Sequence, residues 1–82
     1  MDANQILKEL EVIFKDVLGN DDIVLTRNSS ARDIDEWDSL SHIQLVIAVE
    51  KHYKIKFTSA EHPKWKKVGD MIDNIEKKLS AA

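Results

Sequence analysis

The 82-residue sequence contains no cysteine, one proline and two glycines. Without cysteine the chain can form neither a disulfide nor a thiolate metal site. The scarcity of proline and glycine, together with 33% charged residues, is typical of a folded and mostly helical domain. No apolar run approaches the roughly 20 residues that span a bilayer, and the N-terminus lacks the features of a secretory signal. We therefore expect a cytoplasmic protein that does not associate with membranes.

Charge is distributed unevenly along the chain. Residues 1–50 hold 11 acidic and 4 basic side chains, whereas residues 51–82 hold 8 basic and 4 acidic ones. The two parts therefore carry net charges of −7 and +4. Binding to a nucleic-acid backbone depends on clustered lysine and arginine. The acidic first part and the dispersed lysines of the second argue against nucleic acid as a partner.

Helical periodicity predicts an all-α bundle in a single domain, residues 1–82, because apolar residues recur at spacings of three and four. A chain of this length has no room for a second hydrophobic core. We expect three main helices, a short additional helix and one long loop. Their predicted bounds are about 2–18, 39–53 and 68–79 for the main helices, 59–63 for the short helix and 19–38 for the loop. We expect the bundle to be monomeric.

The predicted loop 19–38 is unusually long for a compact domain, so we expect it to be functional or held by its own apolar side chains. The side chains expected to hold it are Ile23, Leu25 and Ile34. The short helix at 59–63 is expected to stop at Pro63, because the residue before a proline disfavours helical backbone.

The helix predicted at 39–53 carries more apolar surface than one buried face needs. The stripe that we expect to face the core consists of Ile43, Val46, Val49 or Glu50, and Tyr53. Leu40 and Ile47, seven residues apart, form a second stripe. Apolar side chains left outside beside acidic residues make a surface that partner proteins can bind. We therefore predict a docking surface on the outer side of this helix.

The sequence indicates neither a metal site nor a catalytic centre. His42 and His52 lie about 80° apart around a helix, and no histidine has a chelating partner at i+3 or i+4. We therefore expect His42, His52 and His62 to be surface residues. Ser39 and His42 could face each other, but a hydrolase also needs an orienting group and oxyanion donors. Neither is in view, so we expect no enzymatic activity.

A serine follows a cluster of acids at the start of the helix predicted at 39–53, in the segment Asp35-Glu36-Trp37-Asp38-Ser39-Leu40. Serine is a favoured N-cap because its oxygen accepts a hydrogen bond from the first turn. Alternatively, Ser41 with Gln44 has the spacing of a capping box and would leave Ser39 just outside the helix. A phosphodiester attached there would lie at the positive end of the helix dipole. From the residues alone, Ser39 is either a cap or a modification site.

The tripeptide Asp38-Ser39-Leu40 at the start of this helix resembles the hallmark of the acyl carrier protein family. Two further segments are similar to that family. Residues 43–50, Ile-Gln-Leu-Val-Ile-Ala-Val-Glu, resemble its second helix, and residues 68–75, Val-Gly-Asp-Met-Ile-Asp-Asn-Ile, resemble its last helix. Together with the first helix and the long loop, the similarity covers nearly the whole chain. A tripeptide of common residues occurs often by chance, so the setting gives the resemblance its weight.

The resemblance implies a four-helix acyl-carrier-like bundle that carries a covalent 4'-phosphopantetheine arm on Ser39. A phosphopantetheinyl transferase would transfer the arm from coenzyme A, using magnesium and meeting Asp38 beside the serine. The thiol of the arm would then present acyl groups to acyl-loading and acyl-processing enzymes. The implied docking residues are Asp35, Glu36, Leu40 and Ile47. A cavity between the helices would hold the cargo, with the expected lining Ile43, Val46, Phe57, Trp65, Val68 and Ile72.

The sequence departs from the family pattern in ways that affect partners and cargo. The helix predicted at 39–53 has Glu50 as its only acid, whereas members that serve fatty-acid synthesis have a strongly acidic second helix. Trp65 stands where a smaller aliphatic residue is usual, and it either fills the core or shortens the cavity. We therefore predict a carrier for a specialised fatty-acid, lipid or polyketide-type pathway with its own partner set. The alternatives are an aminoacyl or peptidyl carrier and an interaction module that is never modified.

Overall fold

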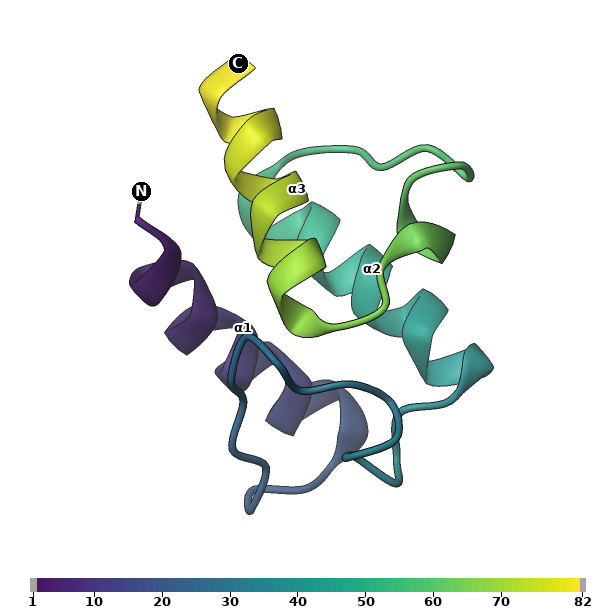
Figure 1. The fold of residues 1–82 in the computed structure, drawn as a ribbon. Helices are drawn as coiled ribbons and strands as arrows, with labels where there is room; N and C mark the ends of the chain where they lie inside the picture. The colour runs from purple at the N-terminus through teal and green to yellow at the C-terminus, as the bar shows by residue number, and fades with distance from the viewer. Residues whose placement is uncertain (1, 82) are drawn as a thin grey trace.

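Three α-helices and one short 3-10 turn make up the fold (Figure 1). The computed structural model describes residues 2–81. Its elements are α1, Ala3–Leu18; α2, Ser39–Tyr53; the 3-10 turn η1, His62–Lys64; and α3, Val68–Ala81. Within residues 2–81 every regular element is helical, which confirms the predicted all-α class.

Local sequence explains where the helices begin and end. Oδ1 of Asp2 accepts a hydrogen bond from the backbone N–H of Gln5 at 2.8 Å, so a free donor in the first turn of α1 is satisfied. Gly19 ends α1 with a left-handed φ of 68°, which glycine adopts without strain. Lys54 ends α2 in the same conformation, with φ of 57°, at a cost of about 1 kcal/mol because it carries a Cβ.

The hydrophobic core lies between the three helices. Its fully buried side chains are Ile6, Leu10 and Phe14 of α1, Leu45 and Val49 of α2, and Val68, Met71, Ile72 and Ile75 of α3. The spacings of three and four along α1 and α3 place these side chains on one face of each helix. The strongly periodic helices therefore pack as their sequences predict.

The orientation of α2 differs from the prediction. Its buried residues are Ser41, Leu45, Val46 and Val49, at spacings of three and four. Ile43 lies on the other side of the helix and is 45% exposed. The prediction that Ile43 faces the core is therefore wrong, and Leu45 takes its place. Both residues are apolar, so periodicity alone does not distinguish them.

The long loop 19–38 is held against the helices, as predicted. Ile23, Leu25 and Ile34 are buried, and Trp37 joins them with its ring edge-on to Phe14, with the ring centroids 5.0 Å apart.

Two backbone hydrogen bonds also tie the loop to the start of α3. The N–H of Val68 donates to the carbonyl of Ser29 at 2.8 Å, and the N–H of Gly69 donates to the carbonyl of Arg27 at the same distance. A Cβ at position 69 would lie 3.0 Å from the Arg27 carbonyl oxygen, so this close approach favours glycine.

The segment between α2 and α3 forms only one short turn. Pro63 lies inside η1 and does not stop a helix at the preceding residue, so the predicted short helix at 59–63 is displaced toward the C-terminus. Proline is tolerated there because the first turn of a helix does not need its N–H. Of the helices within residues 2–81, none combines the length and the apolar character that crossing a bilayer requires.

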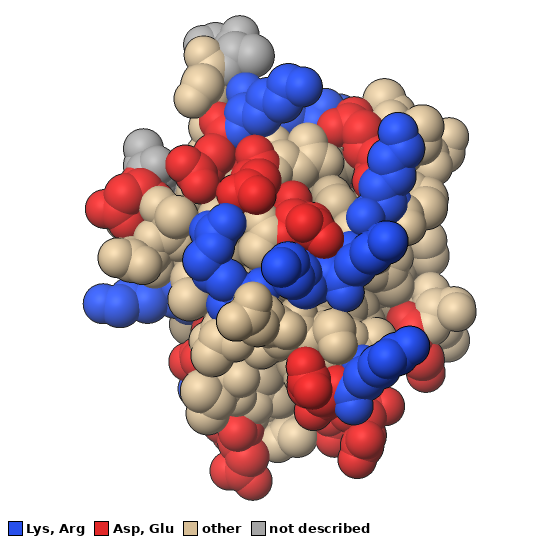
Figure 2. Space-filling view, in the orientation of Figure 1, with Lys and Arg blue, Asp and Glu red and all other residues tan. Residues whose placement is uncertain are grey.

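Charges of both signs are spread over the face drawn in Figure 2. Acidic side chains lie at the lower end of the molecule and again in its upper part, and basic side chains form a band across its middle and also lie at the top.

Candidate functional site

Ser39 is the first residue of α2, and Asp38 caps the helix before it. Oδ1 of Asp38 accepts from the N–H of Ser41 at 2.9 Å, while the N–H of Asp38 donates to Oγ of Ser41 at 2.8 Å. This reciprocal pair is a capping box. The interpretation of Ser39 as a cap is therefore wrong, and so is the predicted capping box of Ser41 with Gln44.

The two serines at the start of α2 have opposite environments. Ser41 is buried, and its hydroxyl donates to the backbone carbonyl of Glu36 at 2.8 Å. Ser39 is exposed, and its hydroxyl takes part in none of the hydrogen bonds found within residues 2–81. A group attached to Ser39 would extend into solvent without breaking a contact. An added phosphodiester would lie at the positive end of the helix dipole, so the site fits a phosphate-linked group.

Three acidic residues precede this serine in the chain, and one of them, Asp38, lines the same pocket. We call Asp35, Glu36 and Asp38 the acidic rim, and all three side chains are exposed. Hydrogen bonds from Ser41 hold the pKa of Asp38 below its usual value, because they stabilise the carboxylate. Nδ2 of Asn20 donates to Oε2 of Glu36 at 3.2 Å and helps to hold that part of the rim.

An apolar stripe continues from the rim along the outside of α2. Leu40 is 72% exposed, Ile43 is 45% exposed and Ile47 is 46% exposed. Their spacing of three and four places them on one face of the helix. The structure thus brings Ile43 to the predicted outer stripe of Leu40 and Ile47. The spacing of Ile43 from Leu40 and Ile47 could have indicated this position, but its spacing of three from Val46 fitted the predicted core stripe equally well.

The far end of α2 is basic. Lys51, Lys54 and Lys56 are exposed, and a shallow pocket of about 350 Å³ lies among them and Ile47. Oε2 of Glu50, the one acid of the helix, accepts from the backbone N–H of Phe57 at 2.8 Å. This carboxylate therefore holds the backbone of the segment that follows α2, and the exposed lysines make the surface at this end of the helix positive.

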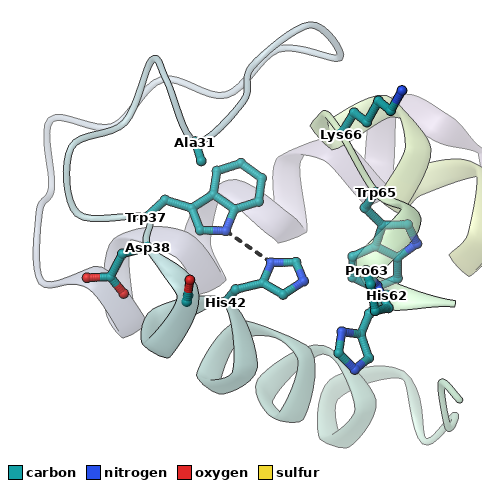
Figure 3. A pocket seen from close by; sticks show the side chains of 9 residues that line it. Ala31, Trp37, Asp38, His42, His62, Pro63, Trp65 and Lys66 are labelled. Carbon is teal, nitrogen blue, oxygen red and sulfur yellow. Dashed lines mark hydrogen bonds between the residues drawn. The ribbon is translucent and has the colours of Figure 1, made fainter. Parts of the chain in front are cut away.

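An open pocket of about 490 Å³ lies beside Ser39, between the start of α2 and η1 (Figure 3). We call it the aromatic pocket, because two indole and two imidazole rings line it. Its lining residues are Ala31, Trp37, Asp38, Ser39, His42, His62, Pro63, Trp65 and Lys66. In Figure 3 Trp37 and His42 lie on one side, and His62, Pro63 and Trp65 lie on the other.

The rings of the aromatic pocket contact one another. Trp37 and His42 stack with an interplanar angle of 13° and centroids 6.1 Å apart. The His42 ring lies 5.6 Å from that of His62 and 5.9 Å from that of Trp65. Trp65 also packs edge-on against Phe57 at 4.8 Å. These distances lie in the range in which aromatic rings attract one another.

His42 has a structural partner and does not serve Ser39. Nε1 of Trp37 donates to Nδ1 of His42 at 3.2 Å, so this nitrogen acts as an acceptor on a neutral ring. Burial lowers the pKa of His42 below 6.5 because it disfavours the charged form. The prediction that the histidines are surface residues is wrong for His42 and His62, which are half-buried. Within residues 2–81 no three His, Asp or Glu side chains converge as metal ligands.

The residues expected to line a cargo cavity do not all lie together. Val46, Phe57, Val68 and Ile72 belong to the packed core, and Trp65 packs against it. Ile43 lies outside. Of the expected set, only Trp65 also lines the aromatic pocket. Sequence reasoning missed Trp37, His42 and His62 as pocket residues, although His42 follows Ser39 by three residues on one helix face.

The arrangement is that of a carrier. An exposed serine at the head of a helix, with acidic residues before it in the chain and an apolar stripe after it, can hold a group covalently and present it to other proteins.

Comparison with known proteins identifies the kind of carrier. An acyl carrier protein from Thermosynechococcus vestitus is 32% identical over 82 residues, covering 99% of this chain and all of the relative. One from Thermotoga maritima is 32% identical over 75 residues, covering 92% and 93%. The solution NMR structure of a holo acyl carrier protein from Geobacter metallireducens has a TM-score of 0.85 and 53% identity, covering 92% of this chain and 86% of the other. No family model matches the chain.

The chain belongs to the acyl carrier protein family. The resemblance stated from the sequence is thereby confirmed. The prosthetic group of this family is a covalently attached 4'-phosphopantetheine, and the Geobacter protein is a holo form. All three relatives are acyl carriers by name, so they do not favour an aminoacyl carrier or an unmodified module.

Proposed function

We propose that this chain carries acyl intermediates of a specialised pathway on a 4'-phosphopantetheine arm attached to Ser39. The observation that carries the assignment is the exposed hydroxyl of Ser39 at the start of α2, beside the buried and fully bonded Ser41. The capping box built by Asp38 and Ser41 fixes the backbone on both sides of Ser39, so the attachment point is held at the start of α2. When bound, the arm supplies a thiol that carries the acyl group as a thioester.

Attachment requires Ser39 to act as a nucleophile toward coenzyme A. Its Oγ forms a bond to the phosphorus that bears the pantetheine, the pyrophosphate P–O bond breaks, and adenosine 3',5'-bisphosphate leaves. The hydroxyl proton passes to the transferase, because the one imidazole near Ser39 on α2, His42, already accepts a hydrogen bond from Trp37. The carrier contributes the exposed hydroxyl and the helix dipole, and the transferase contributes the base and the magnesium ion.

Intact mass spectrometry tests the attachment. The protein is incubated with coenzyme A and a broad-specificity phosphopantetheinyl transferase, and we expect a mass gain of one phosphopantetheine. The Ser39→Ala variant should show no gain, while Ser59→Ala, which removes another exposed serine, should gain it fully. A gain that persists in Ser39→Ala would contradict the assignment.

We assign partner docking to the acidic rim and to the apolar stripe of Leu40, Ile43 and Ile47. The stripe exposes three large apolar side chains in a row, which is costly in water and typical of a binding surface. The predicted docking set of Asp35, Glu36, Leu40 and Ile47 therefore gains Ile43. Phosphopantetheinyl transferases and acyl-loading and acyl-processing enzymes are the partners that this surface would meet.

The lysines at the far end of α2 support a partner set that differs from that of acidic carriers. Charges at the rim of an interface mostly set the association rate and specificity. We expect the double change Lys51→Glu and Lys54→Glu to raise the kcat/KM of a loading enzyme with a basic docking surface about tenfold at low salt. The matched control is Lys8→Glu with Lys77→Glu, which changes net charge equally but lies on α1 and α3. Equal effects of both pairs would refute local charge recognition.

A further inference from the structure

The outer face of α2 carries opposite charges at its two ends. The acidic rim lies at the start of the helix, and the apolar stripe follows it along the helix. Three exposed lysines lie at the other end, and we call them the lysine patch: Lys51, Lys54 and Lys56. Along one surface the order is therefore negative, apolar and positive.

The lysine patch continues the line of the apolar stripe. Steps of four and three residues lead from Ile47 to Lys51 and on to Lys54, as they do along the stripe itself. At 100° per residue, the stripe and these two lysines lie within about 80° around the helix axis. With a rise of 1.5 Å per residue, Ser39 and Lys51 lie about 18 Å apart along α2. One flat partner surface can therefore contact both ends at once.

The charges at both ends remain free for a partner. The ion pairs found within residues 2–81 include no member of the acidic rim or of the lysine patch. Glu50 lies among the lysines, but they outnumber it, and its carboxylate already accepts from the N–H of Phe57. Cations at the end of a helix also offset its dipole, which accounts for Lys51 and Lys54. Lys56 lies beyond the helix, so the dipole does not account for it.

The two ends act as separate patches in solution. At physiological ionic strength the screening length is about 8 Å, less than half of the distance of about 18 Å between the patches. A partner therefore meets each sign locally and does not meet their sum. A uniformly basic surface would gain at the acidic rim and lose at the lysine patch, and a uniformly acidic surface would do the reverse.

The shallow pocket at the lysine patch fits an acidic side chain. Ile47 and Ile55 supply apolar contacts for the methylene groups of an entering aspartate or glutamate. The ammonium groups of the lysines around them can donate charge-assisted hydrogen bonds to its carboxylate. This end of the helix therefore has its own preference, distinct from that of the acidic rim.

We propose that the outer face of α2 docks on a partner protein whose surface carries charges of both signs. The partner has a basic patch opposite the acidic rim, an apolar groove for the stripe, and an acidic side chain that enters the pocket at the lysine patch. This inference rests on the proposed function, because it names the chemistry of the partner that the docking surface meets. The two signs also fix the orientation, with Ser39 at the basic end of the partner.

The test uses helical peptides as probes, each with one apolar stripe and the same length as α2. The two-signed peptide has glutamates in its first half and lysines in its second half. The control peptide has the same composition with the charges alternating, and circular dichroism verifies that the two are equally helical. Each peptide is labelled with fluorescein and held at nanomolar concentration, so that it stays monomeric, while the unmodified full-length protein is added. Because several exposed ion pairs act together, we expect the two-signed peptide to bind about tenfold more tightly at low salt, and less so at high salt.

Variants locate the recognition on α2. Lys51→Glu with Lys54→Glu should remove the preference for the two-signed peptide. The control Lys8→Glu with Lys77→Glu changes net charge equally on α1 and α3, and it should keep the preference. If the first pair lowers the helix content, Lys56→Glu tests the same patch from outside the helix and should reduce the preference.

The orientation is measured by NMR. A nitroxide on the lysine end of the two-signed peptide should broaden the amide signals of Asp38 and Ser39 and spare that of Lys54. The opposite pattern would overturn the proposed orientation of the partner.

The remaining outcomes separate this inference from the carrier function. Equal binding of the two peptides by a chain that gains the arm would overturn the two-signed partner and leave the carrier function intact. Binding of neither peptide would overturn docking at the apolar stripe as well. The face is also complementary to itself in an antiparallel pair, so sedimentation is measured over a range of concentrations. A dimer that Lys51→Glu with Lys54→Glu abolishes would assign the face to a second copy of the chain and overturn the proposal.

Discussion

Truncating two neighbouring apolar residues of α2 should have very different consequences for stability. Leu45 has no exposed surface, whereas Ile43 is 45% exposed. Leu45→Ala removes buried methyl groups and leaves a cavity, which costs about 2–5 kcal/mol in comparable cores. Ile43→Ala removes groups that are half in solvent, so its cost should be about 1 kcal/mol. A domain of this length has a total stability of about 4–12 kcal/mol, so the first change removes a large share of it.

Urea denaturation followed by circular dichroism at 222 nm, a wavelength that reports helix, measures both costs on the same protein. The midpoint of Leu45→Ala should fall well below that of Ile43→Ala, with similar slopes for both if each unfolds in two states. Val24→Ala is the control for an exposed apolar residue, since Val24 is 76% exposed. Equal losses for Ile43→Ala and Leu45→Ala would refute the orientation of α2 and, with it, the docking stripe.

Three further outcomes follow from the start and the outer face of α2. Asp38→Ala should lower the urea midpoint at neutral pH. The pKa of Asp38 is lowered in the folded state, so its carboxylate stabilises the fold above the ordinary pKa of 3.8, and this stabilisation is lost as the pH falls through the folded-state pKa. The pKa of His42 is lowered in the folded state, so between about pH 7 and about pH 5 the unfolded chain binds more protons and the melting temperature of the protein should fall as the pH falls. In His42→Phe this decrease of the melting temperature should be smaller. Leu40→Ala and Ile47→Ala should each raise the KM of a loading enzyme several-fold and cost under about 1 kcal/mol in urea melts; an unfolded Ile47→Ala protein would disprove the outer position of Ile47.

The helices were predictable where one apolar stripe dominates. α1 and α3 each have a single buried face, and their periodicity identifies it. α2 has apolar residues on every side, so its pattern is compatible with more than one orientation, and tertiary packing decides. The buried hydroxyl of Ser41 donates a hydrogen bond to the carbonyl of Glu36 and thereby fixes the orientation of the first turn of α2. The spacing of apolar residues does not predict that hydrogen bond.

The candidate site was predictable in its local part only. Ser39 and the acidic rim are contiguous in sequence and lie at a helix start that the sequence marks. The aromatic pocket joins Trp37 and His42 to His62 and Trp65, which are 20 or more residues away along the chain. These side chains come together only because η1 packs against α2, and no local sequence pattern predicts how those two elements pack.

The backbone hydrogen bonds between the long loop and α3 couple the motion of the two segments, because the loop cannot detach without breaking them. Amide protons in the first turn of a helix normally exchange with water without any opening of the protein. Those of Val68 and Gly69 are held by the loop, so they should exchange slowly and only when the loop detaches. Since both partners are main-chain groups, the two amides become internal reporters of how often the loop detaches from α3, and substitutions of the buried side chains that hold the loop should speed their exchange.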